Sequence, residues 1–126
     1  MSTIRNFKDL LVWQAAVRLA TQTYQLTRSF PPEERCGLQS QLRRAAVSIA
    51  SNIAEGHSRQ YDNEFRQFLH IALGSLAEME TQIHIANELK YLREADLHEV
   101  FGQIDEVRKM CWGMIRAIDR TCGLEN

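Results

Sequence analysis

Apolar residues recur at alternating steps of four and three residues through two long stretches of the chain, and this spacing constrains the fold most strongly. A mean step of 3.5 residues is typical of helices that pack side by side at about 20°. The sequence therefore predicts long, nearly parallel or antiparallel helices at residues 62–91 and 96–122. The first series is Phe65, Leu69, Ala72, Leu76, Met79, Ile83 and Ala86, and the second is Leu97, Val100, Ile104, Val107, Cys111, Met114 and Ile118.

Two further helices are expected earlier in the chain, at residues 9–29 and 33–55. Asp9 is the expected N-cap of the first helix, Pro31 and Pro32 separate the two, and Gly56 is expected to cap the C-terminus of the second. Short connections favour antiparallel neighbours. We expect an all-α domain over residues 1–126, an antiparallel up-down-up-down four-helix bundle of unspecified handedness. The expected inner faces are Leu10, Trp13, Val17, Ala20 and Tyr24 on the first helix and Leu38, Leu42, Ala45, Ile49 and Ile53 on the second.

Several helices carry a second apolar stripe, which is more apolar surface than one bundle needs. Exposed stripes of this kind lower solubility unless another surface covers them. The sequence therefore predicts self-association. The additional residues are Leu11, Val12, Ala16 and Leu19, then Phe68, Ile71, Leu73, Ile85 and Leu89, and finally Phe101, Trp112 and Ile115.

The net charge of −1 is the sum of two unlike halves. Residues 1–60 carry a charge of +4 and residues 61–126 carry −5. Such an asymmetry indicates either a nucleic-acid face or complementary surfaces that meet in an oligomer. The near-neutral total differs from the strongly basic composition of dedicated nucleic-acid binders.

A polar stripe borders the apolar face of the second predicted helix. One interpretation is a ligand groove with Arg44 as an anion anchor and Glu55 as an acid or base. The other, which we favour, is a structural network that fixes the bundle register, with Arg44 and Glu55 buried and paired. The residues of this network are Gln41, Arg44, Ser48, Asn52 and Glu55 on the second helix and Ser75, Glu78 and Gln82 on the third.

Arginines on the same helix are the candidates for nucleic-acid contact. Arg35, Arg43 and Arg59 could together bind phosphates, weakly in one chain and more strongly when an oligomer multiplies them. Ordinary solvated surface charge is the simpler interpretation, since no aromatic pair or glycine loop accompanies them.

No motif predicts catalysis, a cofactor or a metal. The Glu-x-x-His spacing of di-iron bundles is absent, and Glu80 precedes His84 by four residues. Cys111 falls in the apolar series, which indicates an inert buried thiol. Three cysteines without a C-x-x-C pair, no signal peptide and no long apolar run predict a reduced, cytoplasmic protein away from membranes.

Distinctive motifs are spread over nearly the whole chain. They are FKDLLVWQ at residues 7–14, FP at residues 30–31, QLRRAAVSI at residues 41–49, SNIAEG at residues 51–56 and EF at residues 64–65 with Phe68, Leu69, Gly74, Ser75 and Glu78. These motifs closely resemble those of a known family, the four-helix-bundle proteins named after the intervening sequences of bacterial 23S ribosomal RNA genes. Cys36 and Tyr61 depart from the usual pattern.

This resemblance implies a bacterial, cytosolic bundle that assembles into a ring of five and has no established enzyme activity. The accessory variability determinant proteins of diversity-generating retroelements are similar in fold, and they bind nucleic acid and a reverse transcriptase through a basic surface. The acidic second half of this chain departs from that surface. We therefore expect a non-enzymatic homopentameric scaffold or partner-binding protein. The alternatives are an RNA- or DNA-binding accessory protein and, less favoured, a small-molecule site inside the bundle or ring.

Overall fold

The fold is a bundle of four long helices. The computed structural model describes residues 6–122, and within them it contains four α-helices, two short 3-10 turns and no strand. The 3-10 turns are η1 (Phe7–Asp9) and η2 (Pro32–Glu34), and the helices are α1 (Leu11–Thr27), α2 (Leu38–Ser58), α3 (Asp62–Glu88) and α4 (Glu94–Cys122).

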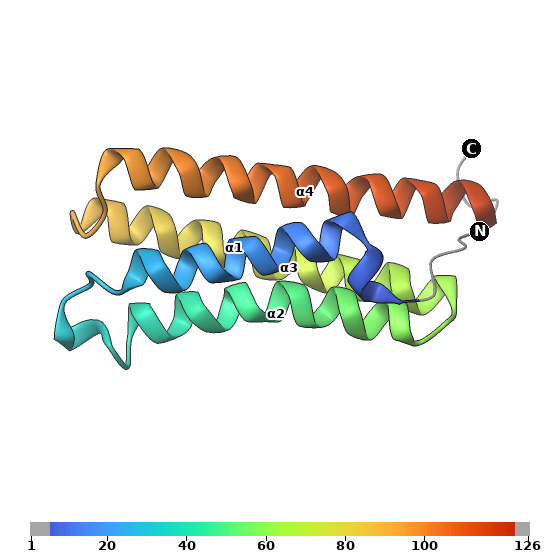
Figure 1. Cartoon of the computed structure of the whole chain (residues 1–126), viewed down its shortest axis with the longest axis horizontal. Coiled ribbons are helices and arrows are strands. Elements are labelled where there is room, and N and C mark those ends of the chain that lie inside the picture. The colour runs from blue at the N-terminus through green and yellow to red at the C-terminus, as the bar shows by residue number, and fades with distance from the viewer. Residues whose placement is uncertain (1–5, 123–126) are drawn as a thin grey trace.

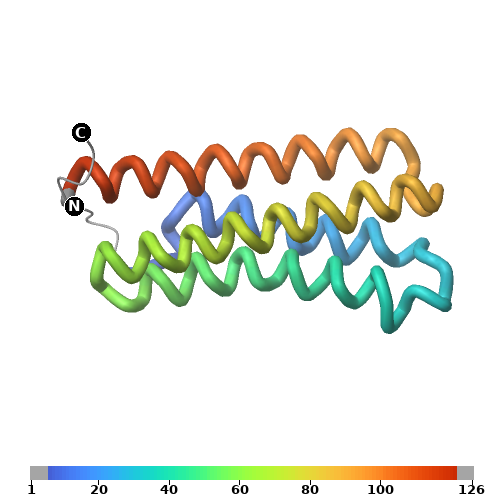
Figure 2. Tube along the Cα trace, turned by 180° about the vertical axis from the view of Figure 1, so that it is seen from behind, coloured from blue at the N-terminus to red at the C-terminus, as the bar shows by residue number. Residues whose placement is uncertain are grey.

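Each helix runs antiparallel to the next, in the up-down-up-down order predicted from the short connections (Figure 1). α1 packs against α2, α2 against α3 and α3 against α4, and α4 returns to contact α1. The view from behind in Figure 2 shows the same order, with α2 beside α3. Each helix therefore has two neighbours, and α1 lies diagonally across the core from α3.

The core is formed mainly by the residues of the two 4-3-4-3 series. All seven members of the α3 series are buried, and in α4 only Leu97 and Met114 are half-buried. Ile115, expected in a second stripe of α4, is also buried in the core.

Most residues of the two apolar stripes of α1 exchange the places expected for them, while Leu10 is buried and Leu11 is exposed as expected. Val12, Ala16 and Leu19, expected in the second stripe, are buried in the core, because α1 contacts both α2 and α4 and needs a wide apolar face. The stripe expected to face inward, which includes Trp13 and Tyr24, lies instead at the outer edge of the contact with α2. This exchange places an apolar surface between α1 and α2.

The helix boundaries differ from the predicted ones mainly around α2. Pro32–Glu34 form a 3-10 turn, so α2 begins at Leu38 and not at residue 33. The Leu38 N–H donates to Glu34 Oε1 at 3.1 Å, which caps the first turn of the helix. Asp9 belongs to η1 and does not cap α1.

Residues with a left-handed backbone conformation end α2 and α3. Gln60 and Lys90 have φ values of 68° and 64°, a left-handed conformation that ends α2 at Ser58 and α3 at Glu88, before the expected residue 91. α1 ends at Thr27 and not at residue 29, and α4 begins at Glu94 and not at residue 96.

Gly56 lies inside α2, so its predicted role as a C-terminal cap is wrong. It is buried where α2 crosses α3, and a Cβ atom built on it would lie 2.5 Å from Cβ of Phe68. Gly56 therefore lets the two backbones approach closely at this end of the bundle.

Candidate functional site

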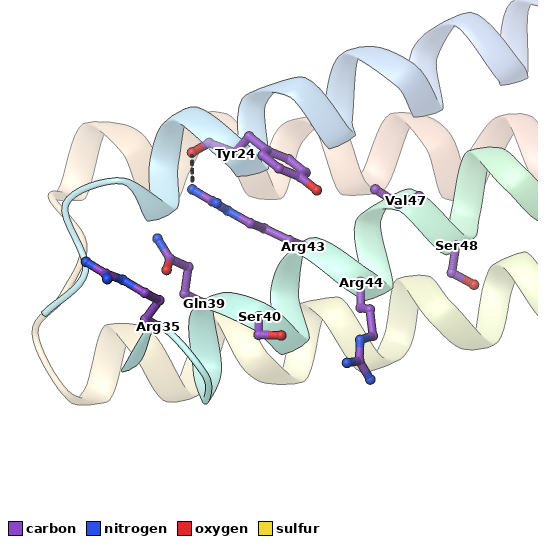
Figure 3. Close-up of a pocket in the computed structure, with 8 residues that line it drawn as sticks. All are labelled: Tyr24, Arg35, Gln39, Ser40, Arg43, Arg44, Val47 and Ser48. Carbon is purple, nitrogen blue, oxygen red and sulfur yellow. Dashed lines mark hydrogen bonds between the residues drawn. The ribbon is translucent and has the colours of Figure 1, made fainter. Parts of the chain in front are cut away.

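A groove runs along the outer surface between α1 and α2. It consists of two adjoining hollows of about 500 and 510 Å³ that share Tyr24 and Val47 in their walls. We call the whole feature the α1/α2 groove. One hollow is apolar, and the other is lined by arginines and uncharged polar side chains, which Figure 3 shows in close-up.

The apolar hollow lies between α2 and the stripe of α1 that was expected to face the core. Among the residues that the structure describes, no charged side chain lines it, and the exposed Tyr24 and Val47 lie where it meets the polar hollow. Alanines from both helices keep the lining shallow. The residues that line it are Trp13, Val17, Ala20, Thr21 and Tyr24 of α1 and Val47, Ala50, Ser51 and Ala54 of α2.

The polar hollow contains three arginines and no carboxylate. Arg43 reaches across to α1, where its Nη2 donates to the Tyr24 carbonyl oxygen at 3.2 Å and its Nε to Thr27 Oγ1 at 2.9 Å (Figure 3). Gln39 Nε2 donates to the Thr27 carbonyl oxygen at 2.8 Å. These bonds satisfy carbonyl groups in the last turn of α1, which lack partners inside the helix.

The polar stripe of α2 forms a network with α3 that is smaller than predicted. Ser48 Oγ and Ser75 Oγ lie 3.0 Å apart, and Asn52 Nδ2 donates to the Ser48 carbonyl oxygen at 2.8 Å and to Ser48 Oγ at 2.9 Å. Gln41 and Gln82, members of the same two stripes, also meet, with Gln82 Nε2 donating to Gln41 Oε1 at 3.5 Å. The structure thus brings Ser48, Asn52 and Ser75 together and links α2 to α3 through them.

Arg44, Glu55 and Glu78 do not join this network, and the expectation that Arg44 and Glu55 are buried and paired is wrong for the single chain. All three are exposed. Glu55 bonds Arg59 at 3.0 Å, one turn away on the same helix, while Arg44 points away from Arg43 and Tyr24 at the edge of the polar hollow (Figure 3). Because α2 and α3 pack closely here, only short side chains fit between them and the longer charged ones turn to solvent.

The three arginines proposed for nucleic-acid contact do not form one patch. Arg35 is exposed beside the polar hollow, whereas Arg43 is bonded to α1. Arg59, at the opposite end of α2, pairs with Glu55 at 3.0 Å and Glu64 at 3.5 Å and lies over the Phe68 ring. Arg43 and Arg59 are 16 residues apart in the sequence, which is about 24 Å along a helix, but the partners that Arg43 and Arg59 bind depend on the packing of α1 and α3 against α2.

The buried thiol of Cys111 and the side chains that could bind a metal are the remaining candidates for chemistry. Cys111 is buried in α4, and its burial raises the pKa of the thiol to about 12, so it stays protonated near neutral pH. Among residues 6–122, no cluster of three or more His, Cys, Asp and Glu side chains could hold a metal ion. No helix in the same span has the length and apolar character needed to cross a membrane.

The groove and the Ser48 network lie within the segment that carries the family motifs, and comparison with family models confirms the resemblance. The model of the 23S rRNA-intervening sequence proteins matches residues 8–113. The chain belongs to this family. The match includes all of α1, α2 and α3 and most of α4 of this 23S rRNA-intervening sequence protein.

A solved structure shares the fold of this family member. It is the crystal structure of a protein with unknown function from the S23 ribosomal protein family of Bacteroides thetaiotaomicron. The two chains superpose with a TM-score of 0.78 at 23% sequence identity, and the match covers 86% of this chain and 98% of the other. Among curated proteins, no match to this 23S rRNA-intervening sequence protein is found.

Proposed function

We propose that this 23S rRNA-intervening sequence protein is a non-enzymatic, homo-oligomeric scaffold or partner-binding protein of the cytoplasm, assembling as a ring of five. The observation that carries the proposal is apolar surface left uncovered by the single chain. Six large apolar side chains are 41–50% exposed, and such surface is typical of protein interfaces. They are Tyr24, Val47, Ile71, Ile85, Leu89 and Trp112.

The polar residues also support a structural role. Ser48, Asn52 and Ser75 direct their hydrogen bonds at one another, and Arg43 directs its bonds at α1. Groups used in this way hold helices in register and are not available to bind a substrate. Self-association would leave the ends of the bundle and the uncovered parts of the surface for a second partner, an RNA or another protein.

Light scattering after size exclusion tests the assembly directly. The expected mass at micromolar concentration is about five times the 14.6 kDa of one chain. A different multiple would correct the number of subunits and keep the scaffold. A mass of 14.6 kDa alone would contradict self-association.

The second candidate function is RNA or DNA binding. It is favoured by the polar hollow, where Arg35, Arg43 and Arg44 line a space without a carboxylate. Arg59 contributes less than the sequence predicted, because two glutamates neutralise it.

Binding to structured RNA, measured by fluorescence anisotropy at several salt concentrations, tests this candidate. Phosphate contacts require an affinity that falls steeply as salt rises. Loss of this salt dependence in Arg35→Ala/Arg44→Ala would support the hollow as the site. No affinity at 50 mM salt, or affinity without a salt slope, would exclude phosphate binding as the function.

A further inference from the structure

The α1/α2 groove has a counterpart on the same molecule, an exposed apolar ridge on α3. We define the α3 ridge as Ile71, Glu78 and Ile85, which share one stripe of α3, together with Leu89, which follows the last residue of the helix. We propose that the α1/α2 groove of one copy receives the α3 ridge of a second copy. This inference rests on the proposed self-association and names the two surfaces that meet.

The groove has the shape and the lining to take a helix. Ala20, Ala50 and Ala54 contribute only methyl groups to the apolar hollow, so another helix can come close, while Trp13 and Tyr24 supply larger walls. From Ala54 to Gln39 the groove follows α2 for roughly 22 Å at 1.5 Å per residue. This length accommodates about four helical turns.

The α3 ridge matches this groove in length and in character. Ile71 and Leu89 are 18 residues apart, or about five turns, so they point in the same direction and span roughly 27 Å. Ile71, Ile85 and Leu89 are 50%, 46% and 49% exposed. The chain itself therefore leaves about half of each side chain open to solvent, although α3 packs against two other helices.

Charge complementarity selects a second copy as the occupant. The polar hollow is lined by arginines without a carboxylate, and Arg35 and Arg44 form no ion pair within residues 6–122. The ridge carries the exposed Glu78, with the exposed Glu88 beside Leu89, and neither forms an ion pair within that span. One contact would thus cover both apolar surfaces and bring opposite charges together, in keeping with the +4 and −5 halves of the sequence.

The groove and the ridge lie on different faces of the bundle, so each copy would use one surface toward each of its two neighbours. Such a contact is heterologous, and repeating it closes a ring when the rotation between copies permits. An isologous dimer, in which the same patch meets itself, would instead bury the groove against a second groove. The two arrangements make opposite predictions for mixtures of variants.

Two charge-introducing variants and a control provide the test. Val47→Glu places a carboxylate in the groove, and Ile85→Glu places one on the ridge; both side chains are exposed, so the bundle core is untouched. Leu11→Glu changes a residue that is 68% exposed and lies outside both surfaces. We expect Val47→Glu and Ile85→Glu to be monomers by light scattering at micromolar concentration, and Leu11→Glu to keep the wild-type mass.

Mixing the two monomeric variants separates a heterologous contact from an isologous one. The intact ridge of Val47→Glu can enter the intact groove of Ile85→Glu, and assembly then stops because the other two surfaces are blocked. A 1:1 complex of twice the 14.6 kDa chain mass is expected and nothing larger. If both variants are monomeric and their mixture stays monomeric, the proposed pairing of groove and ridge is wrong.

The remaining outcomes distinguish this inference from the proposed function. Wild-type mass in either variant would overturn the pairing while leaving self-association intact, whereas a monomeric wild-type protein would overturn both. Circular dichroism confirms that each variant is folded. If a glutamate variant unfolds, Val47→Ser and Ile85→Ser replace the pair, with assembly expected to weaken at least tenfold; unchanged assembly in the serine variants would also overturn the pairing.

Discussion

Arg43 contacts Tyr24 in two ways, by a hydrogen bond from Nη2 to the carbonyl oxygen at 3.2 Å and by its guanidinium carbon 4.5 Å from the ring centroid. The same arginine bonds Thr27 Oγ1, which itself donates to the Thr23 carbonyl oxygen at 2.8 Å. A cation at the C-terminal turn of a helix also interacts favourably with the helix dipole. Arg43 therefore attaches α2 to the end of α1.

Replacing Arg43 by alanine should destabilise the protein, whereas the same change at Arg44 should not. Arg43→Ala removes two hydrogen bonds and a cation–π contact, with an expected loss of about 1–3 kcal/mol in the free energy of unfolding. Arg44→Ala removes an exposed side chain and should stay within about 0.5 kcal/mol of wild type. Urea denaturation of the two variants measures the difference, and equal effects would contradict the assignment.

Gly56→Ala should destabilise the bundle even though alanine favours helices. The added Cβ would lie 2.5 Å from Cβ of Phe68, so α2 and α3 must move apart, at an expected cost of about 1–3 kcal/mol. Gly102→Ala is the matched control, because a Cβ there meets nothing within 4 Å and should add about 0.5–1 kcal/mol. Thermal denaturation compares them. A stabilising Gly56→Ala would show that the close approach is not required.

Ionisation of Tyr91 should lower the free energy of unfolding at alkaline pH. Its hydroxyl donates to Glu34 Oε2 at 3.0 Å, and this hydrogen bond, with smaller contributions from burial and from the charges of Glu34 and Glu33, raises the pKa of Tyr91 above 10.0. The stabilisation that this hydrogen bond provides is complete below pH 10. It is lost as the pH rises through the raised pKa of Tyr91 in the folded state.

Comparison of wild type with Tyr91→Phe from pH 8 to 12 measures this loss. The wild-type free energy of unfolding should fall toward that of the variant above pH 10, because the variant lacks the titrating hydroxyl. Glu34→Gln keeps an acceptor for Tyr91 without the charge and should reduce the dependence. Parallel curves for wild type and Tyr91→Phe would exclude the coupling.

The Cys111 thiol should react only when the bundle opens. Burial raises the pKa of Cys111 to about 12, whereas Cys36 is exposed. In a Cys36→Ser/Cys122→Ser background, an aromatic disulfide reagent at pH 8 should modify Cys111 about a thousandfold more slowly in the native protein than in guanidinium. The matched Cys111→Ser/Cys122→Ser variant, which retains Cys36, should react at once. Similar rates in the two variants would show that Cys111 is accessible.

The fold was predictable because the 4-3-4-3 series sets the inner faces of α3 and α4 directly. Periodicity did not distinguish the two stripes of α1. The stripe that contains Val12, Ala16 and Leu19 and the stripe that contains Trp13 both consist of apolar residues at helical spacing. Periodicity shows that a stripe exists, but only the position of the neighbouring helices decides which stripe is buried. Gly56 was misassigned for a similar reason, because its role depends on Phe68 of another helix.

The candidate site was predictable only in part. Ser48, Asn52 and Ser75 are brought together as the polar spacing indicates, but Arg44 and Glu55 are exposed. Helical spacing gives the direction in which a side chain leaves the backbone, and a long charged side chain at the border of two helices then bends toward solvent. The sequence analysis did not predict the α1/α2 groove, although Val47 is a large apolar residue among small ones and lies outside the predicted inner face of α2.

The return of α4 to α1 has a mechanical consequence. Three of the four contacts between neighbouring helices join consecutive elements, whereas α1 against α4 joins the two ends of the chain, and α1 starts at the end of the bundle where α4 finishes (Figure 1). A force that pulls the start of α1 away from the end of α4 would therefore break the contacts between the two helices one after another. It would not have to break all of them at the same time. The contact between α1 and α4 joins the helices that are furthest apart in the sequence, so forming it costs the most loop-closure entropy. It should therefore form last during folding and break first under an applied force.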